Sequence, residues 1–188
     1  LAHGDIRFNA SVQNTMSTSG GGSLILVAGW DGSNGYTAAT PGGAAPGGPL
    51  NFGDFLMNPS WYGNANGNAT GTIYVGDGTQ TANVAVGSRA GLTLAAGYGL
   101  EVLGGAGAAH FGYIGSGTGS IAVRTGLGGI TVDSSAAGWA QIGHGGGVNL
   151  NNVHTAGDIE VSTTGNVILD ATGTAEHSYA QIGMGALG

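Results

Sequence analysis

The chain has 188 residues, of which 42 are glycine, and its three arginines and ten carboxylates give a formal net charge of −7. Charged residues make up 7% of the sequence, where about 25% is usual for a globular domain. So few cations exclude sequence-independent nucleic-acid binding, and so many glycines exclude a long free-standing helix. Cysteine is absent, so neither disulfides nor thiolate metal ligands can hold the fold. No apolar run reaches the roughly 18 residues of a membrane-spanning helix.

The first predicted strands belong to two short motifs that recur along the chain. A Gly-x-Ile-x-Val/Phe motif is centred on isoleucine at Ile6, Ile73, Ile121 and Ile159. The second motif consists of alternating aliphatic residues, at 24–28, 92–96, 130–132 and 167–171. Alternation over about five residues, bounded by Gly, Asn, Asp or Ser, predicts a short, half-buried strand at each copy.

Residues 31–70 interrupt this pattern. The stretch holds all four prolines of the chain and several aromatic residues, among them Phe52, Phe55, Trp61 and Tyr62. Proline cannot donate to a strand ladder, so the stretch is predicted to be an insert loop. A flexible linker has little use for so many aromatics, and we expect an ordered loop that packs over one face of the fold. The alternative is that these four aromatic side chains contact a ligand or partner.

The most specific repeat has the order aromatic, small, variable, Ile, Gly, variable, Gly. Its three copies begin at Phe111, Trp139 and Tyr179, which lie 28 and 40 residues apart. The central isoleucines of the copies are Ile114, Ile142 and Ile182. We expect the aromatic residues and the isoleucines to be structural members of the repeat.

Strand, glycine turn and strand, repeated about every 20 to 30 residues, predict a parallel β-helix. In such a fold alternate Ile, Val and Leu side chains point inward and stack on their counterparts one coil away. An antiparallel sandwich or barrel also has many short strands, but it does not explain whole motifs that recur in a fixed order. We therefore predict an all-β protein in which residues 1–188 form one β-solenoid module, with 31–70 as an insert loop.

The two ends of the chain carry a further prediction. After the Ala-Gln-Ile-Gly copy that begins at residue 140, the sequence continues through a short strand expected at 148–153 to a Gly-Asp-Ile motif. The chain stops just after its last Ala-Gln-Ile-Gly copy, and it starts with Leu1-Ala2-His3-Gly4-Asp5-Ile6, the part of the repeat in which that motif stands. Neither end shows the polar cap that keeps a repeat protein soluble as a monomer. Open strand edges invite another chain or module. We expect an interior module of a longer polypeptide or a subunit that stacks end to end; the alternative is a piece trimmed from a larger protein.

Residues that could carry chemistry are few and scattered. No two histidines have the spacing of a zinc site, and His144 takes the slot of Ser116 and Met184 in the other copies, which favours a turn residue over a ligand. Asp5 and Asp158 share one repeat slot at turns, where Asp accepts bonds from backbone N–H groups. Lysine is absent. We expect no catalytic residue, no metal site and no cofactor, and hence no enzyme.

Three stretches, Gly-Asp-Ile-x-Val, Gly-Asn-Val-Ile-Leu-Asp-Ala and Ala-Gln-Ile-Gly-His-Gly, resemble repeat regions of large bacterial exoproteins. The family they resemble is that of the filamentous-haemagglutinin-like adhesins, which includes proteins exported by two-partner secretion. The resemblance covers residues 1–30 and 71–188 and leaves the insert outside. It implies a right-handed parallel β-helix, export across the outer membrane, and adhesion or fibre formation at the cell surface. The Asn-Pro-Asn-type motif of the family's secretion domain is not in this sequence, so no secretion route and no adhesive residue carry over.

On these grounds we expect a structural or interaction module of an extracellular fibre or adhesin at the bacterial surface. The expected partner is the chain itself or a neighbouring repeat module, with a host or cell-surface glycan or protein as a further candidate. We expect no nucleic acid as a partner and no membrane insertion. The alternative function is a β-helix that binds or degrades carbohydrate through the insert, with Trp61 and Tyr62 as contact residues.

Overall fold

The computed structural model describes residues 2, 4–14, 24–29, 71–88, 91–107, 111–116, 119–134, 138–144, 157–174 and 178–184. Within these residues the protein is all-β, with 14 strands and no helix. The insert at 31–70, with Phe52, Phe55, Trp61 and Tyr62, lies outside the described residues, as does the strand expected at 148–153.

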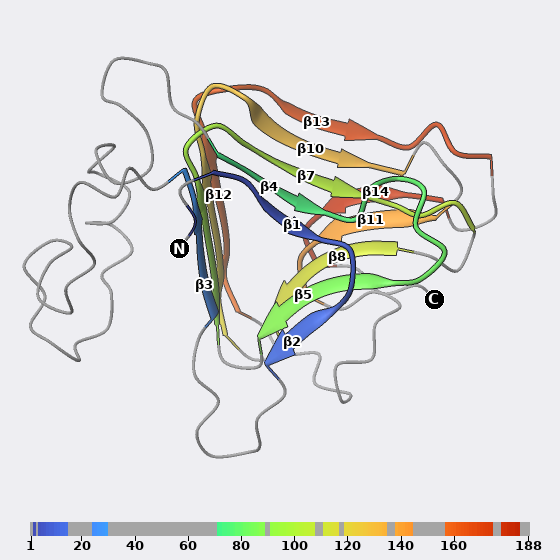
Figure 1. The fold of residues 1–188 in the computed structure, drawn as a ribbon, viewed down its shortest axis with the longest axis horizontal. Helices are drawn as coiled ribbons and strands as arrows, with labels where there is room; N and C mark the ends of the chain where they lie inside the picture. Colours follow the sequence, from blue (N-terminus) through green and yellow to red (C-terminus); the bar gives the residue numbers. More distant parts are fainter. Residues whose placement is uncertain are drawn as a thin grey trace, which may run out of the picture.

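The described strands form three sheets in which every pairing is parallel (Figure 1). Sheet 1 contains, in spatial order, β1 (Ile6–Phe8), β4 (Thr72–Val75), β7 (Gly99–Leu103), β10 (Gly129–Asp133) and β13 (Val167–Asp170). Sheet 2 contains β2 (Val12–Asn14), β5 (Val84–Ser88), β8 (Phe111–Ser116), β11 (Trp139–Ile142) and β14 (Ala180–Ile182). Sheet 3 contains β3 (Leu24–Ala28), β6 (Leu92–Ala96), β9 (Ile121–Thr125) and β12 (Ile159–Thr163).

The chain visits the three sheets in a fixed order. It passes from sheet 1 to sheet 2 to sheet 3 and then returns to sheet 1, where the new strand pairs with the one laid down three strands earlier. We call one such pass a circuit. Successive circuits stack around a common interior, with one sheet on each of three sides (Figure 1). All-parallel pairing excludes the antiparallel sandwich and is consistent with the predicted β-helix.

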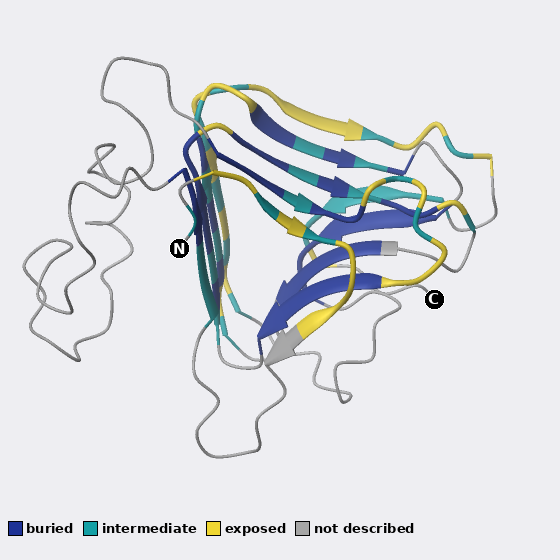
Figure 2. Cartoon of the chain, in the orientation of Figure 1, coloured by how far each residue is buried: buried dark blue, intermediate teal, exposed yellow. Residues whose placement is uncertain are grey.

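Inward-facing aliphatic residues stack in register from circuit to circuit. The first inward row of sheet 1 is Ile6, Ile73, Leu100, Ile130 and Val167. The corresponding row of sheet 2 is Val12, Val86, Ile114, Ile142 and Ile182. The row of sheet 3 is Leu24, Leu92, Ile121 and Ile159. Residues in the inner circuits are almost fully buried and form one continuous core, while burial falls off toward β1 and β13 at the two edges of sheet 1 (Figure 2).

The recurrence of the first two sequence motifs suggested that all copies of a motif would lie on one sheet. Instead, the copies of each motif are divided between sheet 1 and sheet 3. Ile6 and Ile73 are paired on sheet 1, whereas Ile121 and Ile159 are paired on sheet 3. The second motif is divided in the opposite sense, because 24–28 and 92–96 lie on sheet 3 and the later copies lie on sheet 1. The inside-outside alternation is the same on every side of the interior, so either motif fits either side.

The copies of the third motif, in contrast, all lie in one sheet. They are β8, β11 and β14, neighbours in sheet 2. Trp139 pairs with Phe111, and Ile142 pairs with both Ile114 and Ile182. Three strands, β2, β5 and β7, are additional to those that the motifs predicted.

Glycine is required where the backbone turns or where circuits approach closely. Gly129 has a φ of 78° at the start of β10, and an added Cβ there would overlap the carbonyl of Asn166 in the next circuit. At Gly143, just after β11, a Cβ would overlap the carbonyl of Gly183. Residues that carry a side chain resist the positive φ of Gly129, and at Gly143 there is no space for a Cβ atom.

Replacing a core isoleucine should cost far more than replacing an outward one. Ile142→Ala removes a side chain that is 0% exposed and should lower the free energy of unfolding by about 2–5 kcal/mol. Ile168→Ala, at a position 49% exposed on β13, should lower it by about 1 kcal/mol or less. Urea unfolding followed by circular dichroism measures both changes. Equal losses in the two variants would contradict the inward and outward assignment.

Candidate functional site

The open ends of the stack are the most distinctive surface of the described residues. At one end, which we call the C-terminal face, the last strands are β13, β14 and β12; at the other, the N-terminal face, they are β1, β2 and β3. Among the described strands each of these has a partner on one side only, and on β3 the Ala2 bridge occupies part of the other side. An unpaired strand edge is a template for another strand.

The C-terminal face exposes residues that belong to core rows. Val167 and Leu169 are in register with Ile130 and Val132, which are 0% exposed. Val167 and Leu169 are themselves 50% and 51% exposed. The residues on both strands are aliphatic, and the difference arises because no described strand lies beyond β13 in sheet 1. Burying an aliphatic side chain fully contributes about 1.5–3 kcal/mol, and roughly half of that is still available at each of these two positions.

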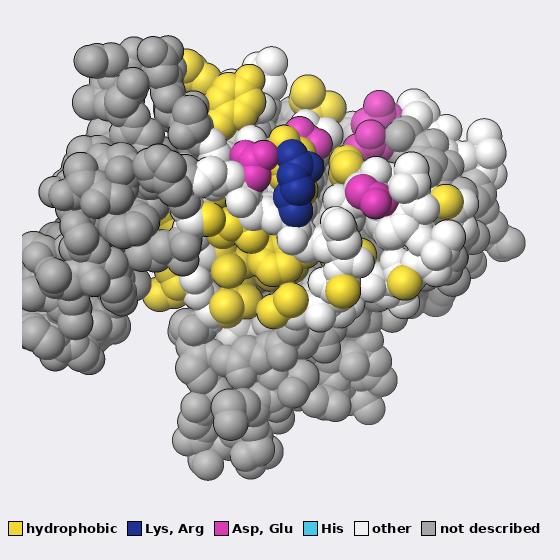
Figure 3. Space-filling model, viewed as in Figure 1, with side chains coloured by type: hydrophobic (Ala, Val, Ile, Leu, Met, Phe, Trp, Pro, Cys, Tyr) yellow, Lys and Arg dark blue, Asp and Glu magenta, His cyan; other side chains and the backbone are white. Residues whose placement is uncertain are grey.

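The N-terminal face has the matching character. Ile6, Phe8, Leu24 and Leu26 pack against the core but are only partly buried, and Val12 is 44% exposed. Hydrophobic side chains gather in the space that β1, β2 and β3 enclose (Figure 3). Both ends therefore present apolar side chains ringed by open strand edges.

A row of mixed residues, most of which carry a polar group, runs along the outer face of sheet 1. Its members, in register order, are Arg7, Tyr74, Glu101, Thr131 and Ile168. The guanidinium of Arg7 lies 3.7 Å from the centre of the Tyr74 ring, a cation–π contact. Burial raises the pKa of Glu101, and Arg7 partly opposes that rise.

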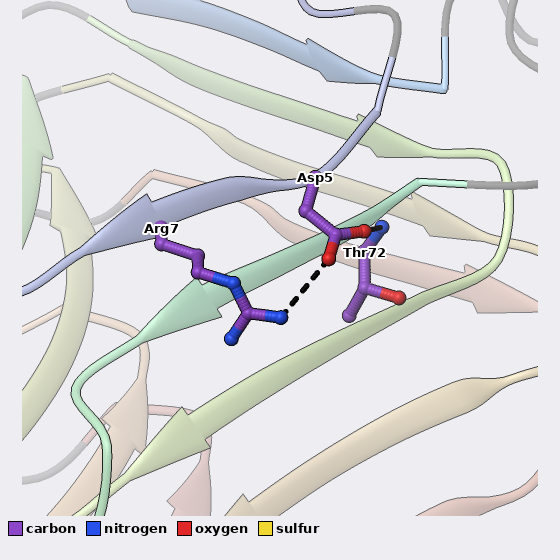
Figure 4. Close-up of polar contacts among 3 residues, drawn as sticks. All are labelled: Asp5, Arg7 and Thr72. Atoms are coloured by element: carbon purple, nitrogen blue, oxygen red, sulfur yellow. Dashed lines mark hydrogen bonds and ion pairs between the residues drawn. The ribbon is translucent and has the colours of Figure 1, made fainter.

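Asp5 joins the first two circuits at this row. Its carboxylate accepts a bond from Arg7 Nη2 at 3.0 Å and another from the backbone N–H of Thr72 at 2.9 Å (Figure 4). Asp5 thus accepts a bond from a backbone N–H group, as expected, but the donor is the first residue of β4 in the next circuit. The ion pair is exposed, so its contribution to stability is small.

The third motif places an aromatic and amide network on the face of sheet 2 that points away from the core. The rings of Trp139 and Tyr179 are stacked at 5.2 Å, and Tyr113 meets Trp139 edge-on at 6.1 Å. The Tyr113 hydroxyl donates to the Gly143 carbonyl at 2.9 Å, and burial raises its pKa. Gln141, 0% exposed, accepts a bond from the Tyr179 hydroxyl at 3.3 Å.

This second buried face was missed by the sequence analysis. The signal was present in the motif itself, because a strand with Trp, Gln and Tyr at its outward positions is suited to burial on both faces. The Gln141 side chain also donates to the Gly183 carbonyl at 3.3 Å, so both ends of its amide bond to the next circuit.

The histidines and carboxylates do not form a chemical site in the part of the chain that the structure describes. His144 lies two residues after the end of β11 and is 2% exposed; the other four histidines lie outside the described residues. Asp77 accepts bonds from the N–H and hydroxyl of Thr79, and these bonds lower its pKa. Among the described residues no group of three or more His, Asp or Glu could hold a metal ion.

No family model, curated protein or solved structure matches this chain. The described residues contain no helix of sufficient length and hydrophobicity to cross a membrane.

The network on sheet 2 predicts a pH dependence of stability. Burial raises the pKa of Tyr179 to about 12, whereas the pKa of a tyrosine in an unfolded chain is about 10. The stabilisation is complete below about pH 10 and is lost as the pH rises toward 12, because only the unfolded chain ionises in that window. Tyr179→Phe should therefore flatten this alkaline loss relative to the unmodified chain. Urea unfolding of both proteins at a series of alkaline pH values makes the comparison, and identical profiles would contradict a raised pKa at the partly buried Tyr179.

Proposed function

We propose that this chain is a structural module of an extracellular bacterial fibre or adhesin, a right-handed parallel β-helix that stacks end to end through its open faces. The observation that carries the proposal is the half-exposure of Val167 and Leu169 at the C-terminal face, in rows whose members in the inner circuits are fully buried. Exposed apolar residues ringed by strand edges are costly on a free monomer. The same residues stabilise an assembly once another circuit covers them.

Handedness is proposed on general grounds and on the family resemblance. Crossovers between parallel strands of one sheet are right-handed in about 98% of cases, because a twisted strand packs back on its sheet only in that sense. The path that connects two successive strands of sheet 1, by way of sheets 2 and 3, is a crossover of this kind. The filamentous-haemagglutinin-like adhesins that the repeats resemble imply the same hand.

The placement outside the cell, at the bacterial surface, rests on that resemblance. A stack of circuits, with strands of neighbouring circuits about 4.8 Å apart, carries a hydrogen-bond ladder along the whole axis. Such a rod bears load without a catalytic centre. Immunogold labelling of intact cells tests the location independently of the assembly itself.

A charge placed on the C-terminal face should prevent assembly. Leu169→Glu buries a carboxylate at each junction and should weaken association at least tenfold, which corresponds to about 1.4 kcal/mol. The matched control is Leu127→Glu, because Leu127 is 62% exposed but lies at the corner between β9 and β10, away from both end faces. Sedimentation velocity over a range of concentrations, with electron microscopy for fibres, gives the measurement. An unmodified chain that stays monomeric at every concentration would contradict end-to-end stacking.

A further inference from the structure

The fifth circuit is incomplete in the residues that the structure describes. Sheets 1 and 2 each have five strands there, ending at β13 and β14, but sheet 3 has four and ends at β12. At the C-terminal face, β13 and β14 therefore stand one circuit beyond β12. No other described strand pairs with β12 on the side away from β9, where one more sheet 3 strand would complete the circuit.

The N-terminal face carries the complementary feature. Ala2 forms a parallel bridge with Ala28 at the end of β3, and its N–H donates to the Val27 carbonyl at 2.8 Å. Nearby, the Gly29 N–H donates to the Gly4 carbonyl at 3.0 Å. The segment that leads into β1 thus runs in sheet 3, on the side of β3 that faces away from β6. This circuit has a sheet 3 segment but no described strand in sheets 1 and 2.

We propose that the two faces join head to tail, and that the Ala2 segment of one copy completes the fifth circuit of the copy before it. This inference rests on the proposed function and specifies its partner, a second copy of this chain, and the register. When β1 of the second copy pairs with β13 and its β2 pairs with β14, its Ala2 segment falls between β12 of the first copy and its own β3. All three sheets then continue through the junction without a gap.

The rows of the fold fix which residues meet. Extending the inward rows puts Ile6 of the second copy on Val167, Phe8 on Leu169 and Val12 on Ile182. Every one of these pairs joins two apolar side chains that are now partly exposed.

Two further contacts follow from the same rows. On the outer face Arg7 of the second copy meets Ile168, and in sheet 3 its Ala2 meets Thr163, because the row of Ala28 continues to Thr163. Asp170 would pair with the uncharged Asn9, so the junction brings no two carboxylates into register on sheet 1.

Like ends do not fit one another in this way. A two-fold contact joins the same patch on both copies, so two C-terminal faces would leave two vacant sheet 3 positions opposite each other. Head-to-tail contacts of unlike faces do not close when the operation is a translation and rotation along one axis, and they generate filaments.

Cysteine cross-linking tests the register, since the chain has no cysteine of its own. Ile168→Cys and Arg7→Cys are made as separate chains, one of them with a mass tag, then mixed and oxidised. Neighbouring strands lie about 4.8 Å apart, within the Cα separation of about 4.4–6.8 Å that a disulfide spans. We expect disulfides between the two variants, and none when Leu127→Cys replaces Ile168→Cys as the control for random collision.

A second pair tests the completion of the circuit. Thr163→Cys and Ala2→Cys, mixed in the same way, should also cross-link, because Ala2 of the second copy is placed on Thr163. Circular dichroism establishes beforehand that each single variant is folded.

The outcomes separate this inference from the proposed function. Fibres whose disulfides join only copies of the same variant would overturn head-to-tail joining while end-to-end assembly stands. Cross-links at 7 and 168 without those at 2 and 163 would show that the ends meet but that the Ala2 segment does not complete the circuit, which also overturns the inference. A chain that is monomeric at all concentrations would overturn the proposed function, and the inference with it.

Discussion

In-register parallel pairing is the constraint on which the rest of this structure depends. Each residue of a strand stacks on the equivalent residue of the circuits before and after it, so an inward position has to be apolar in every circuit. The row from Ile6 to Val167 and the row from Val12 to Ile182 obey this requirement without exception. Because a circuit covers its neighbour and is covered in turn, burial is a property of the stack and is lost at its ends.

The same constraint accounts for the scarcity of charge. An outward charge repeated in register would place like charges on neighbouring strands, about 4.8 Å apart. Like charges directly opposite each other destabilise a sheet. The outer row of sheet 1 avoids this by changing residue type at every circuit, from Arg7 to Tyr74 to Glu101. On sheet 3 the guanidinium of Arg124 pairs instead with Glu160 of the next circuit. Asp133 and Asp170 are the described exception, in register on β10 and β13.

The sequence predicted the fold class and the third motif because these depend on local alternation and on a pattern several residues long. It could not assign the first two motifs to sheets, since Ile73 and Ile121 occupy equivalent inward positions on different sides of the interior. Strand β5 was missed because Val84–Ser88 is buried throughout, so exposure does not alternate along it. The bridge from Ala2 to Ala28 involves a single residue of the segment before β1, and one residue carries no periodicity. The candidate site is a property of the stack, so only the prediction of open ends pointed toward it.

Stability and association are coupled in a molecule of this kind. The end circuits have the fewest neighbours, and regions with few buried contacts open most easily. Covering β13 with another strand would supply the contacts that Val132 already receives within the chain, so association stabilises the least stable part of the monomer first. A partner that binds the folded state raises its stability by mass action. The interaction that builds one circuit on the next is therefore the same one that would join two copies, and a substitution such as Leu169→Glu tests both at once.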